Sequence, residues 1–78
     1  MVDTARLNDA INEAGIKRAK LASSMGISRQ SLANKINNRT EFRSEEAMYL
    51  MHTLGLNPEA FVAIFFVKKY DSESYWRA

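Results

Sequence analysis

Residues 16–32 read IKRAKLASSMGISRQSL, and this stretch decides the expected fold. Its first half predicts a short helix over about Lys17–Met25, with three residues facing inward: Leu21, Ala22 and Met25. Gly26 ends that helix at a positive φ angle, which glycine adopts without steric cost. Ser28 then caps a further helix of about residues 29–37 or 29–38. The stretch therefore predicts two short helices joined by a tight turn.

The turn between the two helices is Met25-Gly26-Ile27-Ser28. Leu32 and Ile36 give the second of these helices an inner face, and Ile27 leads into it. A tight turn that contains glycine and has apolar residues on both sides is typical of a helix-turn-helix. We therefore interpret residues 16–38 as that motif.

Two of the other predicted helices lie at the ends of the domain. The first is capped by Asp3 or Thr4, ends at Gly15, and carries a stripe at i, i+3, i+4 and i+7: Leu7, Ala10, Ile11 and Ala14. Asn57 as N-cap and Pro58 at the first helical position open the last helix, which runs to about residue 67.

The fourth helix begins after Ser44, with Glu45 and Glu46 near its positive N-terminus, and Gly55 closes it. Its apolar stripe consists of Ala47, Leu50, Met51 and Leu54. Three methionines are expected to fill the core: Met25, Met48 and Met51. No stretch alternates like a strand, so the chain is expected to be all-α, with a five-helix domain over 1–67 and an aromatic tail over 68–78.

Positive charge is concentrated around the predicted motif. The 78 residues contain 11 Lys+Arg and 9 Asp+Glu, a net charge of +2. Residues 17–43 hold seven of these cations and one acid, Glu41, a local charge of +6, whereas the rest of the chain carries −4. Such a block favours a face that binds a polyanion, and a solvated face without a partner is the alternative.

The composition excludes several classes of protein. The absence of cysteine excludes disulfides and thiolate metal sites, and the single histidine, His52, is expected on a helix flank. The longest apolar run, 60–67, is too short to cross a bilayer. Asp3 and Arg6 close behind Met1 exclude a secretory signal, so we expect a cytoplasmic protein. No serine has a histidine or aspartate at a catalytic spacing. We therefore expect no enzyme, no cofactor and no metal.

Residues 16–32 resemble the lambda repressor and Cro family, also called the XRE family. That family places small or apolar residues at the positions of Ala19, Leu21 and Ala22, followed by glycine, an aliphatic residue and Ser/Thr, and all are present. The likeness covers about Leu7 to Val67. Many relatives differ by having Gln at Arg18, an aromatic-Glu pair at Lys35 and Ile36, and Gly at Asn38. These changes affect individual contacts rather than the expected lambda-repressor-like fold.

The resemblance implies that the third helix reads DNA bases. The face opposite Leu32 and Ile36 holds Gln30, Asn34 and Asn37. By resemblance, the base contacts are Arg29, Gln30, Ser31 and Asn34. Gln and Asn suit adenine, and Arg suits guanine. The expected phosphate contacts surround this face: Lys17, Arg18, Lys35, Asn37, Asn38, Arg39, Thr40 and Arg43.

The C-terminal third predicts an association surface. Residues 60–67 are apolar all round, so one side of this helix can close the core and the other needs a second cover. A homodimer is expected to supply it through Phe61, Phe65, Phe66, Tyr70, Tyr75 and Trp76. The alternative is that the tail folds back over the helix within one chain.

These expectations combine into one leading hypothesis. The chain is a sequence-specific regulator of transcription that binds double-stranded DNA as a dimer. It resembles small phage or prophage repressors and acts in a bacterial or phage-infected cell. The second hypothesis is a helix-turn-helix protein-interaction module of antitoxin or antirepressor type, which uses the apolar fifth helix and the tail.

Overall fold

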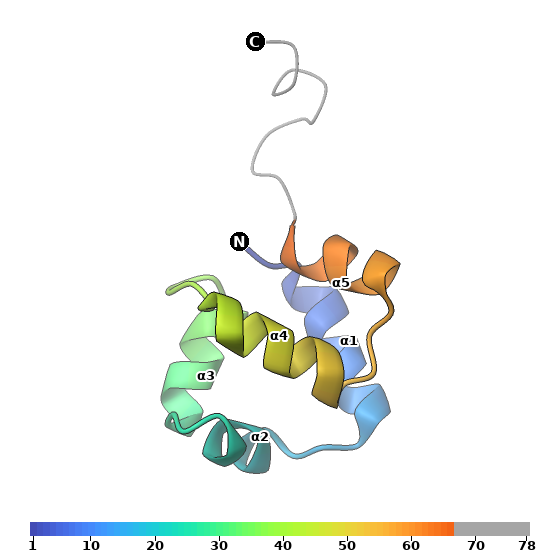
Figure 1. The fold of residues 1–78 in the computed structure, drawn as a ribbon. Helices are drawn as coiled ribbons and strands as arrows, with labels where there is room; N and C mark the ends of the chain where they lie inside the picture. Colours follow the sequence, from blue (N-terminus) through green and yellow to red (C-terminus); the bar gives the residue numbers. More distant parts are fainter. Residues whose placement is uncertain (67–78) are drawn as a thin grey trace, which may run out of the picture.

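The computed structural model describes residues 1–66, which form five α-helices and no strand (Figure 1). The helices are α1 (Thr4–Ala14), α2 (Arg18–Ser24), α3 (Arg29–Ile36), α4 (Ser44–Thr53) and α5 (Pro58–Phe65). The all-α prediction is confirmed for these residues. Val67, the predicted end of the last helix, and the predicted tail, with Tyr70, Tyr75 and Trp76, lie outside them.

Short-range capping sets most helix boundaries where the sequence predicts them. A side-chain oxygen of Asp3 accepts from the backbone N–H of Arg6, that of Ser28 from Ser31, and that of Asn57 from Ala60, at 2.8–3.0 Å. Gly26 has a φ of 73°, as expected for the turn after α2. The start of α4 differs from the prediction that the helix begins after Ser44. Ser44 is the first helical residue, and Arg43 is the N-cap.

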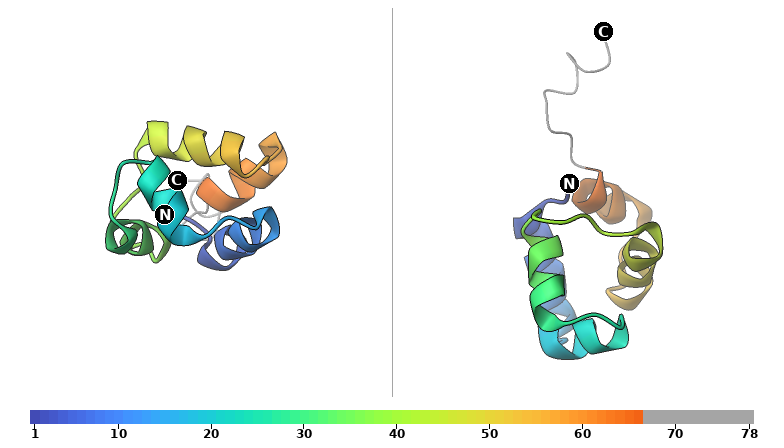
Figure 2. Two further views of the ribbon diagram at one scale, coloured as in Figure 1. Left: turned by 90° about the horizontal axis from the view of Figure 1, so that it is seen from below. Right: turned by 90° about the vertical axis from the view of Figure 1, so that its left-hand side faces the viewer.

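All five helices contribute to one core. The largest fully buried side chains are Leu7, Ile11, Leu21, Leu32 and Leu50, and Ile64 of α5 is 4% exposed. Burial of each such side chain stabilises the fold by about 1.5–3 kcal/mol. Seen from two further directions, the helices surround this common interior (Figure 2). The core thereby fixes how α3 is presented to solvent.

The predicted burial of two residues, Met48 and Ala14, is wrong. Met48 is 59% exposed, because it lies two positions from the buried Leu50 and thus on the opposite side of α4. Ala14 is exposed at the last position of α1, where the chain turns at Gly15.

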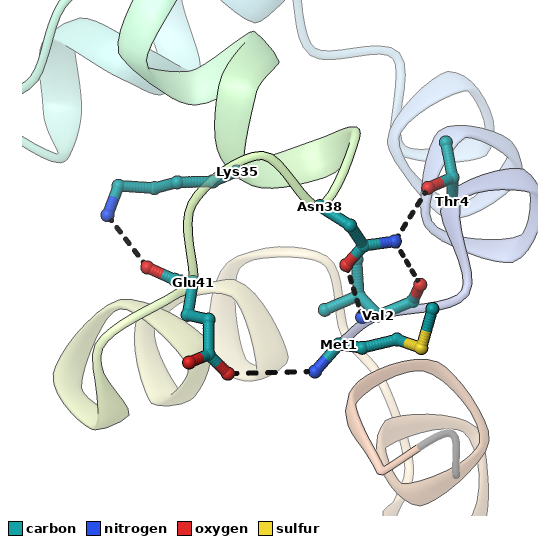
Figure 3. Close-up of polar contacts among 6 residues, drawn as sticks. All are labelled: Met1, Val2, Thr4, Lys35, Asn38 and Glu41. Atoms are coloured by element: carbon teal, nitrogen blue, oxygen red, sulfur yellow. Dashed lines mark hydrogen bonds and ion pairs between the residues drawn. The ribbon is translucent and has the colours of Figure 1, made fainter. Parts of the chain in front are cut away.

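The chain end before α1 is tied to the end of α3 (Figure 3). Val2 donates its backbone N–H to Oδ1 of Asn38 at 2.7 Å, and Nδ2 of Asn38 donates to the carbonyl of Val2 at 2.9 Å. The hydroxyl of Thr4 donates to the carbonyl of Ile36 at 2.6 Å. These bonds join segments more than 30 residues apart and hold the end of α3 in place.

None of the helices in residues 1–66 combines the length and the hydrophobicity that crossing a bilayer requires.

Candidate nucleic-acid interface

The turn after α2 determines how α3 lies. The N–H of Gly26 donates to Ser23 at 3.1 Å, and the N–H of Ile27 donates to Ala22 at 3.0 Å. These bonds form a tight turn between the end of α2 at Ser24 and the start of α3 at Arg29, and the two helices pack against each other. Leu32 is buried at that contact and turns the opposite side of α3 toward solvent.

The predicted base-reading residues lie on the solvent side of α3. Arg29 and Gln30 are exposed, and Ser31 and Asn34 are partly buried. Nε2 of Gln30 donates to Oδ1 of Asn34 at 3.1 Å. This bond orients both amides and leaves the Gln30 oxygen and the Asn34 NH₂ group able to bond to another molecule. The arrangement can present a donor and an acceptor together to an edge of a base.

Most of the predicted phosphate contacts are accessible. The exposed residues among them are Lys17, Asn37, Asn38, Arg39, Thr40 and Arg43. Arg18 is partly buried because α1 holds its side chain: its two terminal nitrogens donate to the side-chain oxygens of Asn8 at 2.8 Å and Asn12 at 3.1 Å.

Lys35 is a correction to the predicted phosphate contacts. It lies three positions after the buried Leu32 and is 9% exposed. Its Nζ lies 3.0 Å from Oε1 of Glu46 and donates to the carbonyl of Glu41 at 3.1 Å. It also lies 6.0 Å from the centre of the Phe42 ring. Its charge is therefore satisfied inside the fold.

Asn38 is a second correction. It takes the left-handed conformation, with a φ of 64°, which asparagine tolerates better than most residues. Its side-chain amide, however, bonds in both directions to the backbone of Val2 and is not free for a phosphate (Figure 3). These hydrogen bonds could not be predicted from the sequence, because Val2 lies 36 residues from Asn38.

The carboxylate of Glu46 is held in its charged form. Burial acts to raise its pKa, but the backbone N–H of Arg43 and the hydrogen bond from Lys35 oppose this. The charges of Lys35 and Arg43 act in the same direction as those bonds, and the net pKa of Glu46 lies below its ordinary value. Glu46 thus keeps Lys35 inside the fold at neutral pH.

A cavity brings together predicted residues from two helices. It has a volume of about 220 Å³ and is lined by Arg18 of α2, by Arg29 and Ala33 of α3, and by Asn37, the C-cap of α3. Asn8 of α1 also lines it and was missed by the sequence reasoning. Asn8 and Asn12 share one face of α1, but only the fold shows that Arg18 reaches that face. Arg43 lines a different cavity, with Ser24 and Tyr49.

The predicted association residues within the described part of the chain divide into two groups. Phe65 is partly buried and packs edge-on against Phe42, with ring centres 5.6 Å apart, and Phe61 stacks on Phe65 at 4.9 Å. Phe66 is 62% exposed. A groove of about 350 Å³ lies beside it, whose apolar lining includes Met1, Met48, Phe61 and Phe66. Residues 70, 75 and 76 of the prediction lie outside the described part of the chain.

A family model described as "Protein of unknown function (DUF739)" matches residues 1–68 of the chain. No curated protein and no solved structure matches it. The family match spans every residue that the structure describes.

Proposed function

The chain belongs to the DUF739 family, whose description assigns no function, and from its own residues we propose that it is a sequence-specific, dimeric DNA-binding regulator of transcription. In this proposal α2 and α3 form a helix-turn-helix of the lambda repressor and Cro (XRE) type. The observation that carries the proposal is the polar solvent side of α3, where Gln30 and Asn34 form a pre-oriented pair beside the exposed Arg29.

Base recognition is assigned to the first turns of α3. A helix fits the major groove of B-DNA, where Gln and Asn bond bidentately to adenine and Arg to guanine. Each good bidentate pair contributes about 1–3 kcal/mol of discrimination against the wrong base. Arg29, Gln30 and Asn34 supply these contacts, and the partly buried Ser31 lies beside them.

Backbone binding is assigned to cationic and neutral polar residues at the start of α2 and after α3. The logarithm of the affinity falls linearly with the logarithm of the salt concentration, and each neutralised phosphate makes this slope steeper by about 0.9. The proposed set omits Lys35 and the side chain of Asn38 and consists of Lys17, Arg18, Asn37, Arg39, Thr40 and Arg43. With about 3–5 contacts in each subunit, binding by a dimer weakens steeply as salt rises.

The proposed mechanism is occupancy of a promoter, as in a small phage or prophage repressor in the cytoplasm of its host cell. A dimer bound to a two-fold site excludes polymerase, with half-sites roughly 34 Å apart. The protein works without an enzymatic step, a cofactor or a metal.

The test is selection of bound duplexes from a random pool, followed by affinity measurements over a salt series. The wild-type protein should enrich a palindromic site. Arg29→Ala with Gln30→Ala should lose the preference for it by about 1–3 kcal/mol per contact and keep the helical circular dichroism spectrum. Ser23→Ala, an exposed change on α2, is the matched control and should keep the preference. Equal wild-type affinity for all sequences would defeat the proposal.

A second candidate function is a protein-interaction module of antitoxin or antirepressor type. The exposed apolar side chains of Met48, Val62 and Phe66 favour it. This alternative expects biological activity to survive the Arg29/Gln30 double substitution and to be lost in Phe66→Asp. The DNA-binding proposal expects the double substitution to abolish activity and Phe66→Asp to weaken it through loss of the dimer, so the double substitution discriminates between the two candidates.

A further inference from the structure

Three polarisable donor groups gather in one shallow surface pocket at the end of α4. The pocket has a volume of about 410 Å³, and its lining consists of Met48, Met51 and His52 of α4 and Gly55, Leu56 and Asn57 of the loop that follows. The whole sequence contains four methionines, one histidine and no cysteine. Three of these five thioether and imidazole groups therefore lie in a single pocket.

Helical spacing brings the three donors to one side of α4. Met51 and His52 follow Met48 at i+3 and i+4, the two spacings that make side chains neighbours on a helix. The buried Leu50 lies on the opposite side and packs in the core. Met48 is 59% exposed, His52 is exposed and Met51 is partly buried. Core packing, the usual role of methionine, therefore does not account for Met48, and its sulfur is accessible to a small ion.

The surroundings of the pocket suit a cation. No lysine or arginine among residues 1–66 lines it, although the sequence holds 11 such residues. His52 lies in the last turn of α4, where the partial negative charge of a helix C-terminus favours a positive ion. None of the residues assigned to DNA contact lines the pocket. The pocket is therefore separate from the proposed DNA-binding mechanism, which uses no metal.

The donor set determines which ion fits. Thioether sulfur is a soft, polarisable ligand that selects Cu(I), and imidazole suits copper as well. Zinc, calcium and magnesium favour sets of thiolate, imidazole or carboxylate ligands. Residues 1–66 hold no group of three or more His, Cys, Asp or Glu side chains that could supply such a set. We propose that Met48, Met51 and His52 bind one Cu(I) ion through two sulfurs and one imidazole nitrogen.

The test uses the full chain and Ag(I), a redox-stable probe of the same soft class. Silver nitrate is titrated in a chloride-free buffer, and the ε-methyl resonances of the four methionines are followed by NMR. We expect the methyls of Met48 and Met51 and the ring of His52 to shift together and to saturate at one equivalent of metal, while the methyls of Met1 and Met25 stay in place. Tetrakis(acetonitrile)copper(I), added without oxygen in competition with bicinchoninate, then measures the affinity for Cu(I).

Three substitutions each remove one ligand. Met48→Leu, Met51→Leu and His52→Asn should each weaken Cu(I) binding by at least about tenfold, because the donors gain affinity from binding one ion together. Leucine has nearly the volume of methionine, so the helical circular dichroism spectrum should persist. Met25→Leu, the same change at a partly buried methionine outside the pocket, is the matched control and should bind as the wild type does.

Three results would overturn the site. One is the absence of a saturable shift of the Met48 and Met51 methyls in the wild type. Another is full Cu(I) binding by His52→Asn, an exposed change that leaves the core untouched. The third is an equal shift of both methyls with Zn²⁺, because the site would then not select a soft ion. None of these measurements contains DNA, so their outcome is independent of the DNA-binding proposal.

Discussion

Lys35 and Glu46 form a largely buried ion pair between the end of α3 and the start of α4, with 3.0 Å between Nζ and Oε1. Removing charges from water costs several kcal/mol per ion unless partners replace the water. The carbonyl of Glu41 and the backbone N–H of Arg43 supply two of these partners. A substitution of either residue therefore leaves the charge of the other largely buried and without its partner.

This pair predicts how stability depends on pH. The folded pKa of Glu46 lies below its ordinary value of about 4.5, so the stabilisation is present above the unfolded pKa and is lost as pH falls through the folded one. Glu46→Gln should cost about 2–3 kcal/mol near pH 7, and the difference from wild type should shrink as pH falls below 4.5 and through the lowered pKa of the folded state. Urea unfolding at several pH values measures it. A pH-independent difference would contradict the account.

Asn38 determines how the α3 helix ends. Its left-handed backbone, with a φ of 64°, directs the chain into the loop before α4, and its side chain binds Val2. The two roles are separable, because glycine keeps the backbone angle and loses the side chain, whereas alanine loses both.

Two substitutions at this position are therefore expected to differ. Asn38→Gly should destabilise the fold by about 1–2 kcal/mol through the lost bonds to Val2. Asn38→Ala should cost roughly 1 kcal/mol more, because alanine resists the left-handed angle. Guanidinium unfolding followed by circular dichroism separates them. Equal stability of Asn38→Gly and wild type would show that the bonds to Val2 contribute nothing.

Features that depend on neighbours in sequence were predictable from it. Ser28 and Asn57 cap the helices that follow them, and Gly26 has the positive φ that its turn requires, because each effect acts within three or four residues. The burial of Lys35 and the hydrogen bonds of Asn38 could not be predicted, because their partners come from other elements. Asn8 could not be predicted for the same reason, because the side chain of Arg18 reaches Asn8 only in the folded chain.

At the scale of the whole molecule, two distinct surfaces lie far apart. The α2 helix and the start of α3 occupy one end of the fold, and the end of α5 occupies the other (Figures 1 and 2). The large apolar side chains that are more than half exposed among residues 1–66 are Met1, Met48, Val62 and Phe66. A second subunit can cover the α5 end and leave the polar side of α3 open.

Self-association is therefore expected to depend on the α5 end. Phe66→Asp or Val62→Asp should shift the protein from dimer to monomer in light scattering, because a charge in an apolar contact lacks a partner. Neither side chain is buried, so the fold should persist. Ala5→Asp, an exposed change on α1, carries the same charge and should leave the dimer intact. A monomeric wild type at micromolar concentration would contradict the dimer.

If the proposed DNA-binding function holds, the hydrogen bond between Gln30 and Asn34 has a consequence for the operator. Two amides that orient each other cannot select their base pairs separately, since rotating one breaks the contact with the other. Preferences at neighbouring operator positions are then correlated, and a table of independent letter frequencies would misjudge the affinity of doubly altered sites.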